Sequence, residues 1–164
     1  ERTLVVNSFS KTYAMTGLRV GYIYGPKELI SSIWLVHQYI VACVNSPSQY
    51  VALAALKGSQ DFVKEMVHEF DRRRHLVYKR LGEIEGFKCV LPKGAFYAFP
   101  SIKDHNMSSE EFSEFLVKEA HVTTVYGSAF GRNGEGYIRI SYAAAYEHLE
   151  EALNRIEKAV KKLK

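Results

Sequence analysis

The sequence contains little of what disulfide-bonded, metal-binding or membrane-spanning proteins need. Its 164 residues include two cysteines, Cys43 and Cys89, with no Cys-x-x-Cys pair and no clustered histidines. We therefore expect buried free thiols in a reducing compartment and no metal site. No apolar run approaches the roughly 18 residues that a transmembrane helix requires, so we expect no membrane partner.

A strong charge bias is also absent. The net charge is +4, with the basic residues dispersed along the chain. The densest basic cluster, DRRRH at 71–75, follows Glu65 and Glu69 in a helical pattern. This arrangement is typical of a solvated helix face, so we expect no nucleic-acid partner.

An initiator methionine is missing as well. The chain starts at Glu1, two residues before the apolar run TLVV, while 47% of its residues are hydrophobic and 24% are charged. That composition is ordinary for a globular protein. A chain that starts almost inside a strand is expected to be cut from something longer, so the lack of a signal peptide carries no information.

Apolar periodicity and turn residues predict alternating strands and helices in the first half of the chain. The expected elements are buried strands at 3–9 and 19–25 and helices at 26–40, 46–57 and 59–84. Beyond Gly86 the elements become shorter. The expected order there is two strands within 87–102, a capped helix at 108–122, strands at 123–131 and 136–143, and a helix at 145–164. We therefore divide the chain into residues 1–85 and a compact second domain, 86–164.

The stretch NSFSKTYAMTGLRVGY, residues 7–22, combines two cations with no acidic residue. Lys11 follows an apolar strand, the end of a strand at which α/β folds place ligands. Arg19 begins the next strand, so a chain reversal can return its guanidinium to the side of Ser8. A hydroxyl and a forked guanidinium suit a phosphate group. An amine beside a phosphate site suggests a Schiff base with a phosphorylated aldehyde, of which pyridoxal phosphate is the obvious example.

The pattern Ser-x-Ser-Lys, with an arginine eight residues after the lysine and then Gly-Tyr, resembles the lysine motif of fold-type I pyridoxal-phosphate-dependent aminotransferases, class I/II. The archaeal and bacterial aspartate or aromatic aminotransferase branch is the most similar. PKGAFYAFP at 92–100 and YIRISYA at 137–143 are similar to its small-domain hairpin and final strand. The resemblance covers essentially the whole chain.

The resemblance implies an α/β fold: the C-terminal part of a three-layer αβα large domain, ending in the interdomain helix at about residue 85, plus an α+β small domain. Lys11 would carry pyridoxal 5'-phosphate as a Schiff base and act as the catalytic base. Ser8 and Arg19 would hold the cofactor phosphate, and Arg139 would bind the substrate carboxylate. We interpret Ser10 as lining the site and Tyr13 as packing.

The parent protein would move amino groups between an amino acid and a 2-oxo acid, usually 2-oxoglutarate, as a cytoplasmic homodimer. The family's pyridine-binding acid and ring-stacking aromatic precede this segment and cannot be assigned, so we expect the 164 residues alone to be inactive. The sequence also departs from the family at Leu18, where tryptophan is usual, and at Tyr126, where proline is common. The second change leaves the side-chain preference open.

Three other functions are weighed against this one. Ser8 to Lys11 also reads Ser-x-x-Lys, but a serine acyl-transfer enzyme would place that motif at the start of a helix and carry a Lys-Thr-Gly element that is not found here. A β-lyase of the same fold shares the lysine motif. A ligand-binding module without turnover stays open too, because residues outside this segment set the reaction type.

Overall fold

The computed structural model describes residues 2–163, and the chain divides into two compact units, Glu1–Glu65 and Met66–Lys164. The division falls within the long helix α3, Asp61–Glu83. Two residues before this helix, the Ser59 hydroxyl accepts a hydrogen bond from the Asp61 amide at 3.1 Å. The domain boundary expected from the sequence lies at the other end of α3 and remains a prediction.

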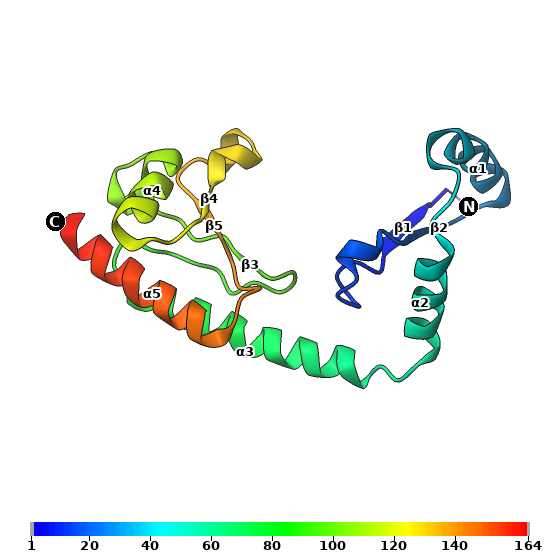
Figure 1. The fold of residues 1–164 in the computed structure, drawn as a ribbon. Coiled ribbons are helices and arrows are strands. Elements are labelled where there is room, and N and C mark those ends of the chain that lie inside the picture. Colours follow the sequence, from blue (N-terminus) through cyan, green and yellow to red (C-terminus); the bar gives the residue numbers. More distant parts are fainter. Residues whose placement is uncertain (1, 164) are drawn as a thin grey trace. The chain divides into compact units, whose positions relative to one another are not determined.

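The first unit contains a two-stranded antiparallel sheet and two helices (Figure 1). Strand β1, Val5–Ser8, pairs with β2, Gly21–Tyr24, in a register that sets Ser8 opposite Gly21. Helices α1, Lys27–Val41, and α2, Ser46–Lys57, follow. The Asn45 side chain caps α2 by accepting from the Ser48 amide at 2.9 Å.

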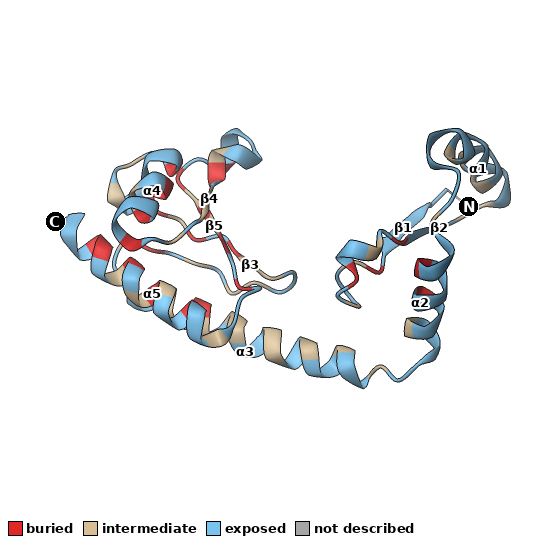
Figure 2. Ribbon diagram, in the orientation of Figure 1, coloured by how far each residue is buried: buried red, intermediate tan, exposed pale blue. Residues whose placement is uncertain are grey.

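Most side chains of this unit are exposed (Figure 2). The predictions of buried strands at 3–9 and 19–25 are wrong for this chain, because all four residues of β1 and all four residues of β2 are exposed. Helix α1 likewise has no buried residue, and Tyr39 is 87% exposed. Cys43 is exposed and Cys89 is half-buried, which corrects the expectation of two buried thiols.

The second unit packs helices against a three-stranded antiparallel sheet of order β3-β5-β4. The strands are β3, Tyr97–Ala98, β4, Val125–Tyr126, and β5, Ile138–Ser141. The helices are α4, Ser109–Phe115, which continues as a π-helical turn to Ala120, and α5, Tyr146–Val160. Ser108 and Glu111 form a reciprocal capping box at the start of α4.

The core of the second unit lies on one face of the sheet (Figure 2). Strand β5 alternates between buried and less buried residues, so Ile138 and Ile140 point into the core while Arg139 points to the other face. Fully buried Leu81 of α3 and Phe112 of α4 pack in the same cluster. The sheet therefore has an apolar inner face and an outer face that carries Arg139.

Helices α3 and α5 lie side by side in this unit (Figure 1). Arg80 of α3 donates to Glu157 at 2.8 Å and to Asn154 at 2.9 Å, both on α5. Lys161 and Arg80 together hold the pKa of the Glu157 carboxyl at about 2.

Two of the expected strands are shorter than predicted. The stretch 87–102 contributes β3 and two isolated bridges, Lys88 with Ser101 and Ser101 with Tyr137. The stretch 123–131 forms β4 and then a 3₁₀ helix, Gly127–Phe130. None of the helices within residues 2–163 is long and apolar enough to cross a membrane.

Candidate functional site

The loop between β1 and β2 carries the predicted lysine. The sheet ladder continues beyond the strand ends, because the Phe9 amide donates to the Val20 carbonyl at 3.1 Å. The side chains of Phe9 and Val20 are buried with Met15 in a small core beneath the loop. Gly21 is required at the strand end, since an added Cβ would lie 2.8 Å from the Asn7 carbonyl oxygen. The loop is thus fixed at its base and supported from one side.

Ser8 organises the start of the loop. Its hydroxyl accepts a hydrogen bond from the Ser10 amide at 3.2 Å, and its own amide donates to the Asn7 side chain at 2.8 Å. The chain then turns sharply, with the Met15 amide donating to the Ser10 carbonyl at 3.1 Å. Lys11 is exposed at this turn. The hydroxyl and the amine are therefore presented by one locally hydrogen-bonded turn.

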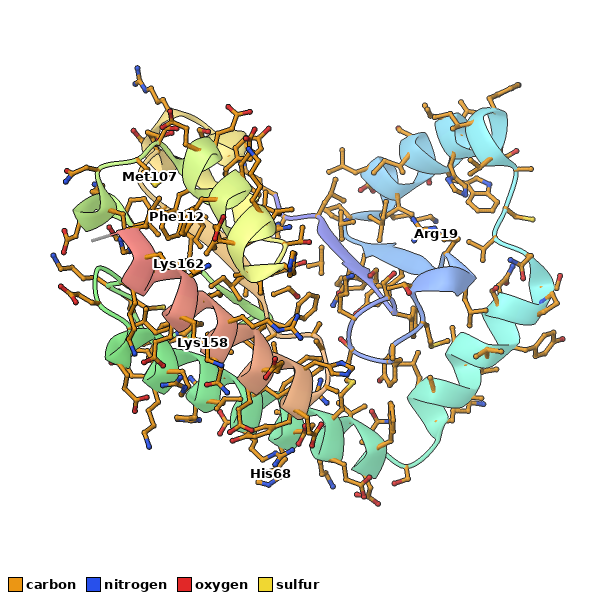
Figure 3. The ribbon with its side chains drawn as sticks, turned by 60° about the vertical axis from the view of Figure 1, so that its left-hand side comes forward. Arg19, His68, Met107, Phe112, Lys158 and Lys162 are labelled. Atoms are coloured by element: carbon orange, nitrogen blue, oxygen red, sulfur yellow. The ribbon has the colours of Figure 1, made fainter. Side chains whose placement is uncertain are left out.

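Arg19 closes the loop in a left-handed conformation, with φ of 55°, at the end of the 3₁₀ helix Thr16–Leu18 (Figure 3). Its guanidinium donates to the Thr16 carbonyl at 3.0 Å. No carboxylate of residues 2–163 forms an ion pair with it. A left-handed backbone is costly for a residue with a side chain and persists where the surroundings impose it, often at functional sites.

The loop therefore offers hydrogen-bond donors and positive charge. No Asp or Glu occurs between Arg2 and Lys27. The antiparallel pairing places Ser8 and Arg19 at the same end of the two-stranded ladder, with Lys11 on the turn between them. Hydroxyl, guanidinium and ammonium groups without a neighbouring acid in the sequence are the donor set that a phosphate requires. The residues present thus fit a phosphorylated ligand.

Tyr13 packs as expected from the sequence. Its ring lies 5.7 Å from the Phe9 ring, and its hydroxyl donates to the Gln60 side chain at 3.1 Å. Tyr13 thereby joins the loop to the start of α3.

Arg139 occupies the centre of the other unit's sheet, so it is described by itself. It lies on β5 between the two edge strands and pairs with Val125 of β4. Its guanidinium lies 4.4 Å from the centre of the Tyr97 ring and 4.8 Å from that of Phe130. The part of the chain that the structure describes provides no carboxylate partner for it.

Sequence reasoning missed both aromatic neighbours of Arg139. Tyr97 lies in the stretch that was compared with the family only as a hairpin motif, with no role given to its side chain. Phe130 lies in a stretch that was predicted to be a strand. The signal available was the alternation in FYAF and YIRIS, which sets Tyr97 and Arg139 on the same outer face of neighbouring strands. Within residues 2–163, no group of three or more His, Cys, Asp or Glu side chains could hold a metal ion.

Comparison with known proteins identifies similar chains. The family model described as aminotransferase class I and II matches residues 1–156. An aromatic-amino-acid aminotransferase 2 of Thermococcus litoralis and an aspartate aminotransferase of Pyrococcus abyssi are each 51% identical to this chain over 166 residues. Both alignments include 100% of this chain and 42% of the relative.

Solved structures give the same result. The crystal structure of an aromatic aminotransferase from Pyrococcus horikoshii OT3 matches with a TM-score of 0.95 and 51% identity, over 99% of this chain and 44% of that one. An aspartate aminotransferase from Rhizobium meliloti matches with a TM-score of 0.93 and 42% identity, over 98% of this chain and 42% of that one. The likeness confirms the predicted fold class, and the chain spans about two fifths of the length of these relatives.

Proposed function

Because the chain belongs to the class I and II aminotransferase family, whose members use pyridoxal phosphate, we propose that it forms part of an enzyme that transfers an amino group between an amino acid and a 2-oxo acid. The observation that carries the proposal is the loop from Ser8 to Gly21. It joins the family's lysine motif to a turn that presents an amine, a hydroxyl and a guanidinium with no acid between Arg2 and Lys27.

Each side chain of the proposed site has a role set by its chemistry. The Ser8 hydroxyl and the Arg19 guanidinium would bind the cofactor phosphate, and the Lys11 amine would hold the cofactor aldehyde. Pyridoxal phosphate, when bound, supplies the electron sink that stabilises a carbanion at the substrate α-carbon. Once the substrate amine has displaced Lys11 from the aldehyde, the freed Lys11 Nζ would take the proton from that carbon, a step that a positioned base accelerates by roughly 10²–10⁴.

Arg139 would bind the substrate carboxylate through two parallel hydrogen bonds, the geometry to which a guanidinium is suited. The lack of an ion-pair partner for Arg139 among the described residues supports this role. The fixed position of its backbone at the centre of the sheet supports it further, because binding then requires only the side chain to be ordered.

The family also suggests an amino acceptor, an assembly, a location and a domain division for the whole protein. We propose 2-oxoglutarate as the usual amino acceptor, a homodimer as the assembly and the cytoplasm as the location. We also propose that residues 1–85 belong to the cofactor-binding large domain and residues 86–164 to the small domain. Turnover is not expected from these 164 residues alone, because the chain spans 42% of its relatives and β1 and α1 leave apolar side chains exposed.

An experiment that tests the proposed function supplies the rest of the fold from a relative. In a chimera, this chain replaces the matching 42% of the Thermococcus litoralis relative. Amino-group transfer from aspartate or phenylalanine to 2-oxoglutarate is then measured, together with the absorbance of bound cofactor. The chimera should be active, and Lys11→Ala should lose both activity and the lysine-bound absorbance. Arg19→Ala should weaken cofactor binding, and Arg139→Ala should raise KM for the amino acid.

Lys27→Ala is the matched control, because Lys27 is an exposed lysine of the same unit outside the loop. It should leave activity and absorbance unchanged. Transamination that persists in Lys11→Ala would refute the assignment. Release of a thiol, ammonia and pyruvate from a cysteine S-conjugate with no added 2-oxo acid would instead identify a β-lyase, and ligand binding without turnover would identify a non-catalytic module.

A further inference from the structure

Arg139 differs from the arginines of α3 in what surrounds its charge. Arg72 lies 4.0 Å from the centre of the Tyr146 ring, and its Nε is also 2.9 Å from Glu69. Arg73 contacts the Phe70 ring and pairs with the same carboxylate. Arg139 contacts two rings, and no carboxylate of residues 2–163 pairs with it.

We propose that Tyr97 and Phe130 are positioning residues, which hold the Arg139 guanidinium in place for a carboxylate by contacting it with their rings. The inference rests on the proposed role of Arg139 in substrate binding and adds the device that orders it. A structural carboxylate would order the guanidinium equally well, but it would compete with the substrate for the same donors. Aromatic rings attract the cation without using its N–H groups in the plane of the fork.

The two rings come from different segments and are themselves supported. Tyr97 lies on β3, beside β5, and its ring packs against Phe96 at 4.6 Å. Phe130 ends the 3₁₀ helix that follows β4, and its ring lies nearly perpendicular to the Phe99 ring, with the ring centres 5.9 Å apart. Phe99 in turn stacks on Tyr137 at an interplanar angle of 4°.

The outer face of this sheet is thus an aromatic surface with one guanidinium at its centre. Holding that guanidinium in advance removes part of the entropy cost of binding, since an arginine side chain loses considerable rotamer freedom when it is fixed. The rings therefore act on affinity for the carboxylate and not on the proton transfer. Loss of either ring should raise KM and leave kcat nearly unchanged in an active enzyme.

The test uses the 164-residue chain and the nuclear magnetic resonance signal of the Arg139 Nε–Hε group, assigned by its loss in Arg139→Lys. In the unchanged chain this signal should be shifted upfield by the rings and show the heteronuclear NOE of an ordered group. Phe130→Leu should return the shift toward that of a free arginine and lower the NOE. Phe130 is 52% exposed, so this substitution leaves the core intact.

Tyr97→Leu should have the same effect, and Tyr97→Phe should retain the ordered signal because the ring is kept. Tyr146→Leu is the matched control, since it removes a ring from Arg72, which Glu69 still pairs. The Arg139 signal should not change in that variant. A signal that is as mobile in the unchanged chain as in Phe130→Leu would overturn the proposal.

A titration with 3-phenylpyruvate separates this inference from the proposed function. It should shift the Arg139 signal saturably, and affinity should fall about tenfold when both rings are replaced by leucine. Equal affinity in all variants would overturn the positioning role and leave Arg139 as the carboxylate site. An Arg139 signal ordered by the rings but unaffected by 3-phenylpyruvate would contradict the carboxylate role itself and, with it, this inference.

Discussion

Gly127 is a glycine at which a single added methyl group should be costly. It starts the 3₁₀ helix that carries Phe130, and its amide donates to the Tyr137 carbonyl at 2.8 Å. An added Cβ would lie 2.5 Å from that same carbonyl oxygen and closer still to the Gly134 carbonyl oxygen. Both atoms belong to backbone, so no side-chain rotation can relieve the overlap.

The cost follows from these two effects. Overpacking a well-packed site costs about 1–3 kcal/mol, and loss of the amide hydrogen bond adds about 1 kcal/mol. We therefore expect Gly127→Ala to lower the free energy of unfolding by about 2–4 kcal/mol, a large part of the roughly 5–15 kcal/mol that a domain possesses. The displaced helix should also carry Phe130 away from Arg139.

Urea unfolding followed by circular dichroism measures the loss, and amide hydrogen exchange of α5 locates it in the second unit. Gly82→Ala provides the matched control, because Gly82 lies in α3 with nothing within 4 Å of an added Cβ. That change should stabilise the helix by about 0.5–1 kcal/mol. Equal stability of Gly127→Ala and the unchanged chain would refute the argument from close backbone approach.

Three further predictions concern the core of the second unit. Burial against Phe87 lowers the pKa of His105 below its ordinary 6.5, and no group within residues 2–163 forms a hydrogen bond with His105 Nε2. As the pH falls, the unfolded chain therefore binds a proton at His105 before the folded chain does, so the free energy of unfolding should decrease below about pH 6.5. Urea denaturation measured across pH 5–8 should show this decrease, and the decrease should be smaller in His105→Leu. Tyr142→Phe removes the hydroxyl that donates to the Ala95 carbonyl at 3.1 Å and should cost about 1 kcal/mol in urea unfolding. Leu81→Ala, at a fully buried position, should cost about 2–5 kcal/mol by the same assay; a loss under 1 kcal/mol would show that the cluster around it is loosely packed.

Helices were predictable from the sequence to a greater extent than strands were. Apolar spacing and turn residues are local signals, so the predicted helices at 46–57, 59–84 and 108–122 match α2, α3, and α4 with its π-helical turn within a few residues. The expected strands at 87–102 and 123–131 were longer than those observed. Their pairing depends on which distant segment lies alongside, and Gly127 turns the second one into a 3₁₀ helix through contacts with Gly134 and Tyr137.

Burial in the first unit shows the same limit. The apolar run at 3–9 predicts a buried strand, and the strand forms, but its side chains are exposed. An apolar pattern predicts that other residues cover a segment, but it does not predict which residues those are. The same holds for α1, whose Trp34 is 56% exposed.

In the candidate site too, residues close together in the sequence were predictable, and contacts between distant segments were not. Ser8, Lys11 and Arg19 could be predicted as one candidate site because their spacing lies within one loop, where twelve consecutive residues contain the whole pattern. Arg139 was predicted only through a motif, and its aromatic neighbours were not predicted at all, since Tyr97 and Phe130 lie 42 and 9 residues away in the sequence. Pairing of β3 with β5 supplies one ring and the turn at Gly127 supplies the other. A candidate site that the sequence presents as one arginine is therefore, in the folded chain, an arginine in contact with two rings, which on our proposal hold the arginine ready for a ligand.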